Sequence, residues 1–521
     1  MKHILALLLL VNISCGYSYN ILFFHDIGTK SHLHLYYPLV EVLLERGHEV
    51  TGVYYGSAKI QHENYTELQI PDNLGKLMKN LSSLYMEEGN SKSNIISISR
   101  LASTWHLLPK YVEDVISTFE REDVKKILQK QFDIVISSSN NVGYVAHVTD
   151  SKIIFISPPG PISMFTSPIG NRFYPSLSPA LGSTFTDPSS MSQRFNNWFA
   201  SVMIDVWTIF HNEFQLYPGL VDTLNYNGPT LLKVISERSQ LVLSNSHSIT
   251  HEPQPFLENV VHVGGLHIKQ TKPLPQDLQI FMDSSPQGVL LVSFGSSITP
   301  SSMSEEKRKV FLEVFEKINI PVIWKWDTGV TADVPKNVLI KDWLPQQDLL
   351  AHPNLKVFVT HGGLLSIMEA IYHETVLVGI PLGNDQRPNL VRLESKNLGI
   401  MLDWDNLSAQ EMILAIQKAM TDVEMAKSMK EMSRLFKDTP ARPVEKAAWW
   451  IEFVIRNGGA DYFKPNSMNL PWYKVLNLDI LVLVLLCILV SVYISYKIFK
   501  SCLRCCCSKG NIVYNYQYYY Y

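Results

Sequence analysis

The sequence predicts an α/β protein built from two doubly wound parallel sheets, and three observations lead to this fold class. Strand-like and helix-like segments alternate in the first half of the chain, and the same alternation returns in the second half. A polar, proline-bearing stretch separates the two series. With 521 residues, 46% of them hydrophobic, the chain is long enough and apolar enough to bury two cores.

The first half shows the strand, helix, strand order that is typical of a parallel sheet with right-handed crossovers. NILFF, beginning at Asn20, is followed by a loop, by an amphipathic segment from His34 to Arg46 and by the strand-like HEVTGVYY. FDIVIS and KIIFIS continue the series. We expect residues 19–263 to form the first domain.

The second half repeats this order and predicts a domain over residues 287–470. GVLLVSF leads into a helix at Ser304 to Ile318, and the strand-like runs PVIWKW, NVLIK, KVFVT, TVLVGIP and GIML follow, with helices between them. Residues 264–286, with KQTKPLPQD, make the linker. Ligands of such sheets bind beyond the carboxyl ends of the strands, so a cleft between the domains is the expected site. The Ser- and Pro-rich Ile162 to Arg194 is expected to be a long loop over it.

The two ends place the chain in a secretory membrane. Residues 1–18 have the basic start, apolar stretch and small residues of a signal peptide. Residues 475–499 are long and apolar enough to span a bilayer, and the basic tail, 500–521, is expected in the cytosol by the positive-inside tendency. The body is therefore expected in the lumen of the endoplasmic reticulum, as a single-pass type I protein.

Composition excludes one class of partner and adds modification sites. A net charge of −3 leaves no basic footprint for nucleic acid. The predicted lumenal body has no cysteine, so no disulfide is expected there, and the cysteine cluster of the tail fits palmitoylation better than zinc. Three Asn-X-Ser/Thr triplets predict glycosylation at Asn64, Asn80 and Asn406.

The most informative segment is WLPQQDLLAHPNLKVFVTHGGLLSIMEAIYHETVLVGIPLGNDQ, which begins at Trp343. Its strand KVFVT ends at His361-Gly362-Gly363, just before a predicted helix from Leu365 to Tyr372. Glycines let the backbone approach a ligand closely, and a helix start offers free N–H groups and a positive dipole. This combination suits a diphosphate.

Other side chains of the segment fit the rest of a nucleotide sugar. Trp343 offers a flat face for a base, and Gln346 can read an amide-bearing base edge. His361 and Ser366 can donate to phosphate oxygens, and Glu369 can accept two ribose hydroxyls. Asp385 and Gln386 could hold sugar hydroxyls.

The joint order W-x-P-Q, H-P, T-H-x-G, S-x-x-E and D-Q closely resembles the signature of UDP-glycosyltransferases, and the resemblance extends over nearly the whole chain. Leu365, where many members have Asn, looks like the insect branch. The resemblance implies the GT-B fold of two facing Rossmann-like domains. It also implies a UDP-sugar co-substrate and neither metal nor cofactor. The donor-binding residues that it implies are Ser296, Trp343, Gln346, His361, Gly363, Ser366, Glu369, Asp385 and Gln386.

Catalysis requires a base on the other side of the cleft, and His32 is the predicted one. It lies where the helix after the first strand begins, and the helix dipole there keeps the ring neutral. The family's catalytic histidine resembles it in place, with a Pro-Leu pair following at Pro38-Leu39. His25 and His34 do not match this spacing.

The sequence departs from the family at the partner of this base. Many members have a carboxylate shortly after a strand like FDIVI, whereas Ser138 occupies the aligned place here. A hydroxyl orients an imidazole but does not stabilise imidazolium as a carboxylate does. Asp26 and Asp150 are the acids that could substitute for it through the fold.

Three functions follow from these observations. The first is an inverting UDP-glycosyltransferase that conjugates a small lipophilic acceptor, as in detoxification, with glucose favoured over glucuronate as the sugar. The second is a non-catalytic carrier on the same scaffold, suggested by Ser138. The third, a nicotinamide-dependent oxidoreductase, lacks the G-x-G-x-x-G fingerprint. The sequence leaves a homo-oligomer open.

Overall fold

The structure is a computed structural model that describes residues 18–26, 30–72, 98–180, 183, 185–295, 303–326, 334–383 and 385–508. The chain divides into two compact units, Met1–Phe463 and Lys464–Tyr521. The first unit contains both predicted sheets. Of the predicted features, the signal peptide, Ser296 and Asn80 fall outside the described residues, apart from Ser18 at the end of the signal.

The first sheet, within the described residues, has seven parallel strands in the order β3-β2-β1-β4-β5-β6-β7. Consecutive side chains of β1 point to opposite faces, so Leu22 and Phe24 lie in one core while Ile21 and Phe23 lie in the other. Both faces are therefore covered, as parallel sheets require. The strands are β1 (Asn20–His25), β2 (Glu49–Tyr54), β3 (Tyr65–Gln69), β4 (Ile134–Ser137), β5 (Lys152–Ser157), β6 (Ser239–Ser244) and β7 (Val260–His262).

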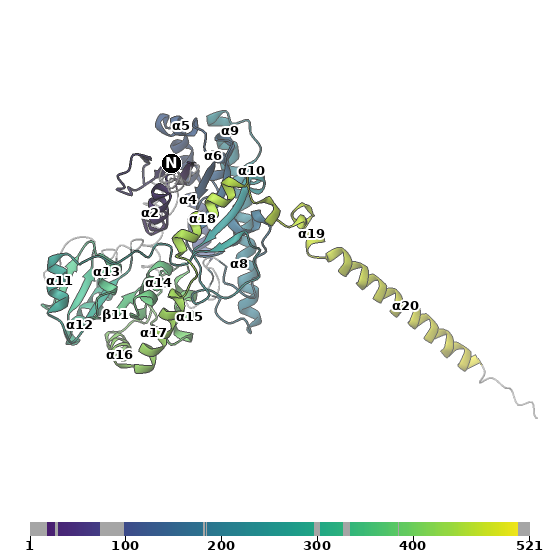
Figure 1. The fold of residues 1–521 in the computed structure, drawn as a ribbon. Coiled ribbons are helices and arrows are strands. Elements are labelled where there is room, and N and C mark those ends of the chain that lie inside the picture. The colour runs from purple at the N-terminus through teal and green to yellow at the C-terminus, as the bar shows by residue number, and fades with distance from the viewer. Residues whose placement is uncertain are drawn as a thin grey trace, which may run out of the picture. The chain divides into compact units, whose positions relative to one another are not determined.

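Helices from both halves of the sequence cover this sheet. α2 (Lys30–Glu45) and α18 (Pro443–Arg456) share one core with it, and Figure 1 shows α18 beside these strands. Arg46 and His48 bond Glu452, and Arg46 also bonds Glu445. The predicted second domain, 287–470, includes α18, which packs here on the first sheet. The other face is covered by α4 (Ile98–Glu120), α5 (Glu122–Leu128), α6 (Val142–Val148) and α10 (Leu231–Arg238).

The second sheet has six parallel strands among the described residues, in the order β10-β9-β8-β11-β12-β13, around one continuous core. Its strands are β8 (Val289–Ser293), β9 (Val322–Lys325), β10 (Val338–Lys341), β11 (Leu355–Thr360), β12 (Val376–Gly379) and β13 (Gly399–Met401). Its helices are α11 (Gln276–Asp283), α12 (Glu305–Lys317), α13 (Gln346–Leu350), α14 (Leu364–Tyr372), α15 (Gln386–Ser395), α16 (Ala409–Thr421) and α17 (Val423–Lys437). Two parallel Rossmann-type sheets confirm the predicted fold class.

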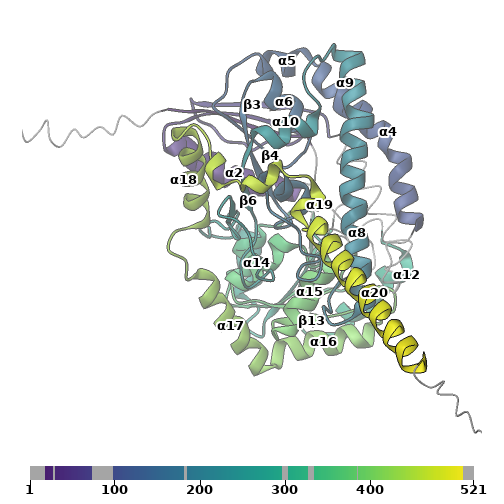
Figure 2. The ribbon, with the colours of Figure 1, turned by 90° about the vertical axis from the view of Figure 1, so that its right-hand side faces the viewer.

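The predicted long loop from Ile162 to Arg194 is only partly a loop. It contains α7 (Ser163–Thr166) and η1 (Ser167–Ile169), and α8 (Met191–Ile209) begins before its expected end. This helix continues through a π-helical stretch, η2 (Phe210–Leu216), into α9 (Tyr217–Leu224), as Figure 2 shows. This long helix was not expected from the sequence.

The second unit contains one helix, among the residues described, that is long and apolar enough to cross a membrane. α19 (Trp472–Val475) precedes it, and α20 (Leu478–Ser508) contains the candidate span, Leu478–Arg504. Short 3-10 turns, η4 (Asp461–Phe463) and η5 (Asn466–Asn469), lie before them in the sequence. The predicted span, 475–499, coincides with most of the apolar helix.

Candidate functional site

The order of the strands reverses once in each sheet, and some of the predicted site residues, among them His32 and His361, follow strands at these two reversals. In the first sheet, β1 and β4 are neighbours, although β2 and β3 continue on one side and β5 on the other. In the second sheet, β8 and β11 are neighbours in the same way. Strand connections leave in opposite directions at such a point and open a crevice beyond the carboxyl ends.

In the second sheet, the glycines at this edge shape the place of His361. β8 and β11 pair with Ser293 opposite Thr360, so the residues after each strand meet. A Cβ on Gly295 would lie 2.8 Å from His361 Cε1, and one on Gly363 would lie 2.6 Å from His361 Nε2. Gly362 has a φ of +84°, which L side chains rarely adopt. The glycines therefore seat an imidazole beside the start of α14, as well as leaving the backbone accessible.

Lys325 is a cation at this site that the sequence analysis missed. It is the last residue of β9, and its Nζ donates to the carbonyl of Gly295 at 2.9 Å. Burial, and then the charge of Lys325, lower the pKa of His361 to about 4. The imidazole is thus a neutral donor or acceptor, and the positive charge beside it comes from the lysine. Its position near the carboxyl end of the strand-like run PVIWKW is the sequence feature that could have identified it as a site residue.

Three predicted donor-binding residues from two helices lie in one cluster. Gln346, the first residue of α13, donates its Nε2 to Ser366 Oγ at 3.0 Å and to Glu369 Oε2 at 2.5 Å. Ser366 and Glu369 lie one turn apart on α14, and both are buried. Burial raises the pKa of Glu369 to about 7, while the hydrogen bonds from Gln346 and Gln347 lower it. A carboxylate that carries charge near neutral pH is available to accept hydroxyls.

Trp343 lies three residues before Gln346 in the chain. Its side chain is 66% exposed, whereas the other tryptophans of the second sheet, Trp324, Trp326 and Trp404, are buried in its core. An indole face is therefore open for stacking.

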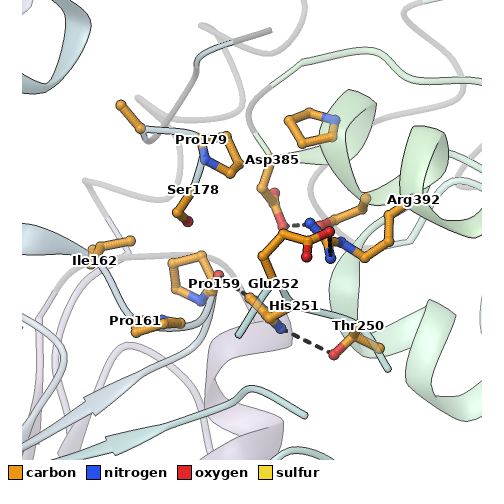
Figure 3. Close-up of a pocket in the computed structure, with 13 residues that line it drawn as sticks. Pro159, Pro161, Ile162, Ser178, Pro179, Thr250, His251, Glu252, Asp385 and Arg392 are labelled. Carbon is orange, nitrogen blue, oxygen red and sulfur yellow. Dashed lines mark hydrogen bonds and ion pairs between the residues drawn. The ribbon is translucent and has the colours of Figure 1, made fainter. Parts of the chain in front are cut away.

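Asp385 lines a cavity of about 50 Å³, partly open to solvent, between α15 and loops that follow strands of the first sheet. Figure 3 shows Asp385 and Arg392 facing Pro159, Pro179 and Glu252. Asp385 Oδ2 accepts from Asn389 Nδ2 at 2.8 Å, and burial raises the pKa of its carboxyl. A carboxyl from the second half of the chain therefore faces loops of the first half across this cavity.

Gln386 has a structural task beside Asp385. Its Oε1 accepts from the backbone N–H groups of Leu382 at 2.7 Å and Gly383 at 3.0 Å. The side chain is buried. Only its Nε2 group is left for the predicted contact with a sugar.

At the first sheet, the structure distinguishes the three clustered histidines. His25 ends β1 and is 0% exposed, whereas part of His32, near the start of α2, is exposed. Burial lowers the pKa of His32 to about 4, and burial followed by the charge of His32 lowers that of His25. Desolvation and the charges of Lys269 and Lys325 lower the pKa of His34. His34 thus lies within electrostatic range of the second half.

Ser138 pairs with His25, and this differs from the role that its aligned place suggested. Ser138 Oγ lies 2.8 Å from His25 Nδ1, and the rings of His25 and His32 have centroids 6.1 Å apart. The strand register explains this pairing. Phe23 lies opposite Ile136, so two residues further on His25 meets Ser138. Ser138 therefore orients the buried histidine, which in turn packs near His32.

The two acids considered as substitutes lie elsewhere. Asp26 follows His25 and points to the opposite face, where its Oδ2 accepts from Asn141 Nδ2 at 2.7 Å. Its buried carboxyl has a pKa raised to about 6, chiefly by desolvation. Asp150 is exposed and pairs with Arg238. Neither acid contacts the two histidines in the described part of the chain.

The other predicted features are placed as follows. Asn406 is exposed and Asn64 is half-buried, so both predicted acceptors reach the surface. Phe173 lines a small apolar cavity with Ile162 and Ala180. This cavity adjoins the larger one at Ile162, Pro179 and Ala180, which line both.

Comparison with known families gives one match over nearly the whole chain. The family described as "UDP-glucoronosyl and UDP-glucosyl transferase" matches residues 29–512. The UDP-glycosyltransferase UGT5 of Dactylopius coccus is 31% identical over 512 residues, which cover 95% of this chain and 94% of that protein. The UDP-glucuronosyltransferase 2B19 of Macaca fascicularis is 29% identical over 495 residues, covering 90% of each.

Solved structures agree in fold. Os79 from O. sativa, solved in complex with a trichothecene, has a TM-score of 0.55 at 15% identity and covers 84% of this chain and all of its own. CalG4, the calicheamicin glycosyltransferase, has a TM-score of 0.52 at 18% identity, covering 84% of this chain and 98% of its own. At these identities the likeness concerns the GT-B arrangement of two parallel sheets.

Proposed function

This chain belongs to the UDP-glucoronosyl and UDP-glucosyl transferase family and is a UDP-glycosyltransferase. We propose that it transfers a hexose to a hydroxyl of a small lipophilic acceptor, with inversion at the anomeric carbon and with His32 as general base. Glucose is the proposed sugar, and glucuronate is the second choice. The observation that carries the proposal is the cluster at the second sheet, where Gln346 bonds Ser366 and Glu369 and the exposed Trp343 lies three residues before Gln346 in the chain.

The donor is proposed to lie along this edge. Uracil stacks on Trp343, the ribose hydroxyls bind Glu369, and the diphosphate lies at the start of α14 near His361. Lys325 supplies positive charge there, and the N–H groups of the helix start supply the dipole. We propose that these groups stabilise the leaving UDP without a metal or cofactor.

The sugar would then extend towards Asp385 and the cavity against the first half. His32 takes the proton of the acceptor hydroxyl, the acceptor oxygen bonds to the anomeric carbon, and the bond from that carbon to UDP breaks. Direct displacement inverts the configuration. Partial exposure supports His32 over His25, because the wholly buried His25 has no surface for an acceptor.

The low pKa of His32 bears on the acceptor. A ring with a pKa of about 4 is neutral at physiological pH but is a weak base. No described carboxylate contacts it to stabilise the imidazolium. Acidic acceptors such as phenols, which part with a proton more readily, are therefore the proposed substrates. The weak basicity of His32 also supports the alternative function, a carrier that binds UDP-sugars and catalyses weakly or not at all.

Location is part of the proposal. The candidate span in α20, the glycosylation triplets and the basic residues that follow the span support a single-pass protein of the endoplasmic reticulum with a lumenal body.

One experiment separates the enzyme from the carrier. Membranes with the full chain are incubated with UDP-glucose or UDP-glucuronate and a phenolic acceptor, and UDP release is compared between wild type and His32→Ala. Acceptor-dependent release that His32→Ala abolishes supports the proposal. Binding of donor without release in both proteins supports the carrier.

A further inference from the structure

His267 is a buried histidine in a segment where burial is unexpected. The connection between β7 and α11 becomes exposed from Lys269 to Pro273, as surface loops usually are. His267 is nevertheless 2% exposed. A buried polar ring needs hydrogen-bond partners to offset its lost hydration, and its partners point to a task.

One nitrogen of this ring faces the helix that carries the proposed ribose carboxylate. Nε2 lies 3.1 Å from the carbonyl oxygen of Leu365 and 3.5 Å from Glu369 Oε1, one turn along α14. Nδ1 is buried and has no hydrogen-bond partner among the residues that the structure describes. Because two acceptors face Nε2 and no described acceptor faces Nδ1, we assign the proton of a neutral ring to Nε2. Burial, which lowers the pKa of His267 to about 3, agrees with this state.

Gln347 extends the same arrangement from the other side. Its Nε2 donates to the carbonyl oxygen of His267 at 3.1 Å and to Glu369 Oε1 at 3.2 Å. Its Oε1 accepts from the backbone N–H of Lys269 at 3.0 Å. The connecting segment thus clamps both ends of this amide and directs it at the carboxylate.

The two oxygens of Glu369 therefore have different surroundings. Oε1 accepts from Gln347 and lies 3.5 Å from Nε2 of His267, both of them tied to the connecting segment, while Oε2 accepts from Gln346. Ribose hydroxyls need a carboxylate whose orientation is set before the ligand arrives, because otherwise binding must order it. Gln346 is a proposed ligand residue itself, so the restraint on Oε1 is the one independent of the nucleotide.

We infer that His267 is a positioning residue that, with Gln347, holds Glu369 in the orientation that receives the two ribose hydroxyls of the nucleotide. The inference rests on the proposed function. Under this inference, the segment that connects β7 and α11 contributes to recognition of the donor. The segment also contacts the helix of the proposed base, because Lys269 Nζ bonds Glu41 of α2 at 2.9 Å.

The test compares two nucleotides that differ only in the ribose hydroxyls. Binding of UDP and of 2′,3′-dideoxy-UDP is measured by calorimetry on the full chain in nanodiscs. The variants are His267→Ala, His267→Gln, whose amide can reach the place of Nε2, and His267→Asn, whose amide is too short. His373→Ala, which removes a half-buried ring from the far end of α14, is the matched control.

Wild type and His373→Ala are expected to prefer UDP by about tenfold or more, since hydrogen bonds to a charged group are among the strong ones. In His267→Ala and His267→Asn the preference falls towards unity, while dideoxy-UDP binds as in wild type. His267→Gln restores it. In turnover, KM for the UDP-sugar rises in His267→Ala while kcat changes little.

An equal loss of affinity for both nucleotides in His267→Ala, or an unchanged preference, overturns the inference and leaves the proposed function intact. Absence of UDP binding to folded wild type overturns both. If His267→Ala does not fold, the contrast between His267→Gln and His267→Asn decides in the same way.

Discussion

Replacing Glu369 by Gln should weaken donor binding and, relative to wild type, make stability rise from pH 5 to pH 8. Glu369 is 7% exposed, and the pKa of its carboxyl is raised from 4.5 to about 7, chiefly by burial. The charge near neutral pH therefore carries a cost in folding free energy. An amide of the same shape is neutral at every pH. The substitution therefore removes the free-energy cost of burying a charge, and it also removes the charged carboxylate that would accept hydrogen bonds from the ribose hydroxyls.

The magnitude follows from linkage. Below pH 4.5 the carboxyl is protonated in the folded and unfolded states and contributes nothing. As pH rises towards 7, the unfolded chain loses this proton first, so the folded state loses stability. A pKa difference of about 2.5 corresponds to about 3 kcal/mol when complete, and to about 2 to 3 kcal/mol between pH 5 and pH 8.

The assay is thermal unfolding of wild type and Glu369→Gln in nanodiscs at pH 5 and pH 8. Unfolding entropy scales with chain length, so each kcal/mol moves Tm by roughly 1 °C in a unit of this size. The advantage of Glu369→Gln should grow by roughly 2 to 3 °C from pH 5 to pH 8. Any mismatch of the new amide with Gln346 or Gln347 is independent of pH and cancels in this difference.

Two results would refute this reasoning. An advantage that is the same at both pH values would mean that Glu369 carries no charge cost. Undiminished preference of Glu369→Gln for UDP over 2′,3′-dideoxy-UDP would mean that the carboxylate does not hold the ribose.

His32→Ala should lower kcat by about 10²- to 10⁴-fold with UDP affinity unchanged, because general bases contribute that much; lost UDP binding would contradict it. Ser138→Ala should lower kcat by less than about tenfold, since Ser138 contacts His25; a loss as large as that of His32→Ala would show a direct catalytic part. In Gly363→Ala the new Cβ, 2.6 Å from the ring of His361, should weaken UDP binding by about tenfold and leave uridine binding unchanged. Lys325→Ala should weaken UDP binding in a salt-dependent way, and Lys325→Arg should retain it.

The two parallel sheets could be predicted from the sequence because parallel strands that are buried on both faces consist of short, nearly continuous apolar runs. KVFVT and KIIFIS became β11 and β5 almost to the residue. The long helix of α8, η2 and α9 was missed, because its Ser- and Pro-rich approach was interpreted as a loop reaching Arg194. Met191, Phe195 and Trp198 are exposed on α8, so its pattern lacks the polar outer face that marks most surface helices.

Most of the proposed donor-binding residues could be named from the sequence, since they follow one another in a single segment. Its partners were not. Lys325 reaches Gly295 from a neighbouring strand. The pairing of Ser138 with His25 depends on a strand register that spans more than a hundred residues. His267 seemed part of a polar linker, and only the packing of that linker against α14 brings it to Glu369. Contacts of this kind are decided by tertiary structure.

The central claim is that a uridine nucleotide binds along the second sheet with its base on Trp343. Calorimetric titration of UDP into the folded full chain, repeated with Trp343→Ala, tests it most directly. We expect saturable binding to wild type and a loss of about tenfold or more in the variant, because stacking on an aromatic ring contributes about 1 to 3 kcal/mol. No heat of binding with folded wild type, or equal affinity in the two proteins, would contradict the claim.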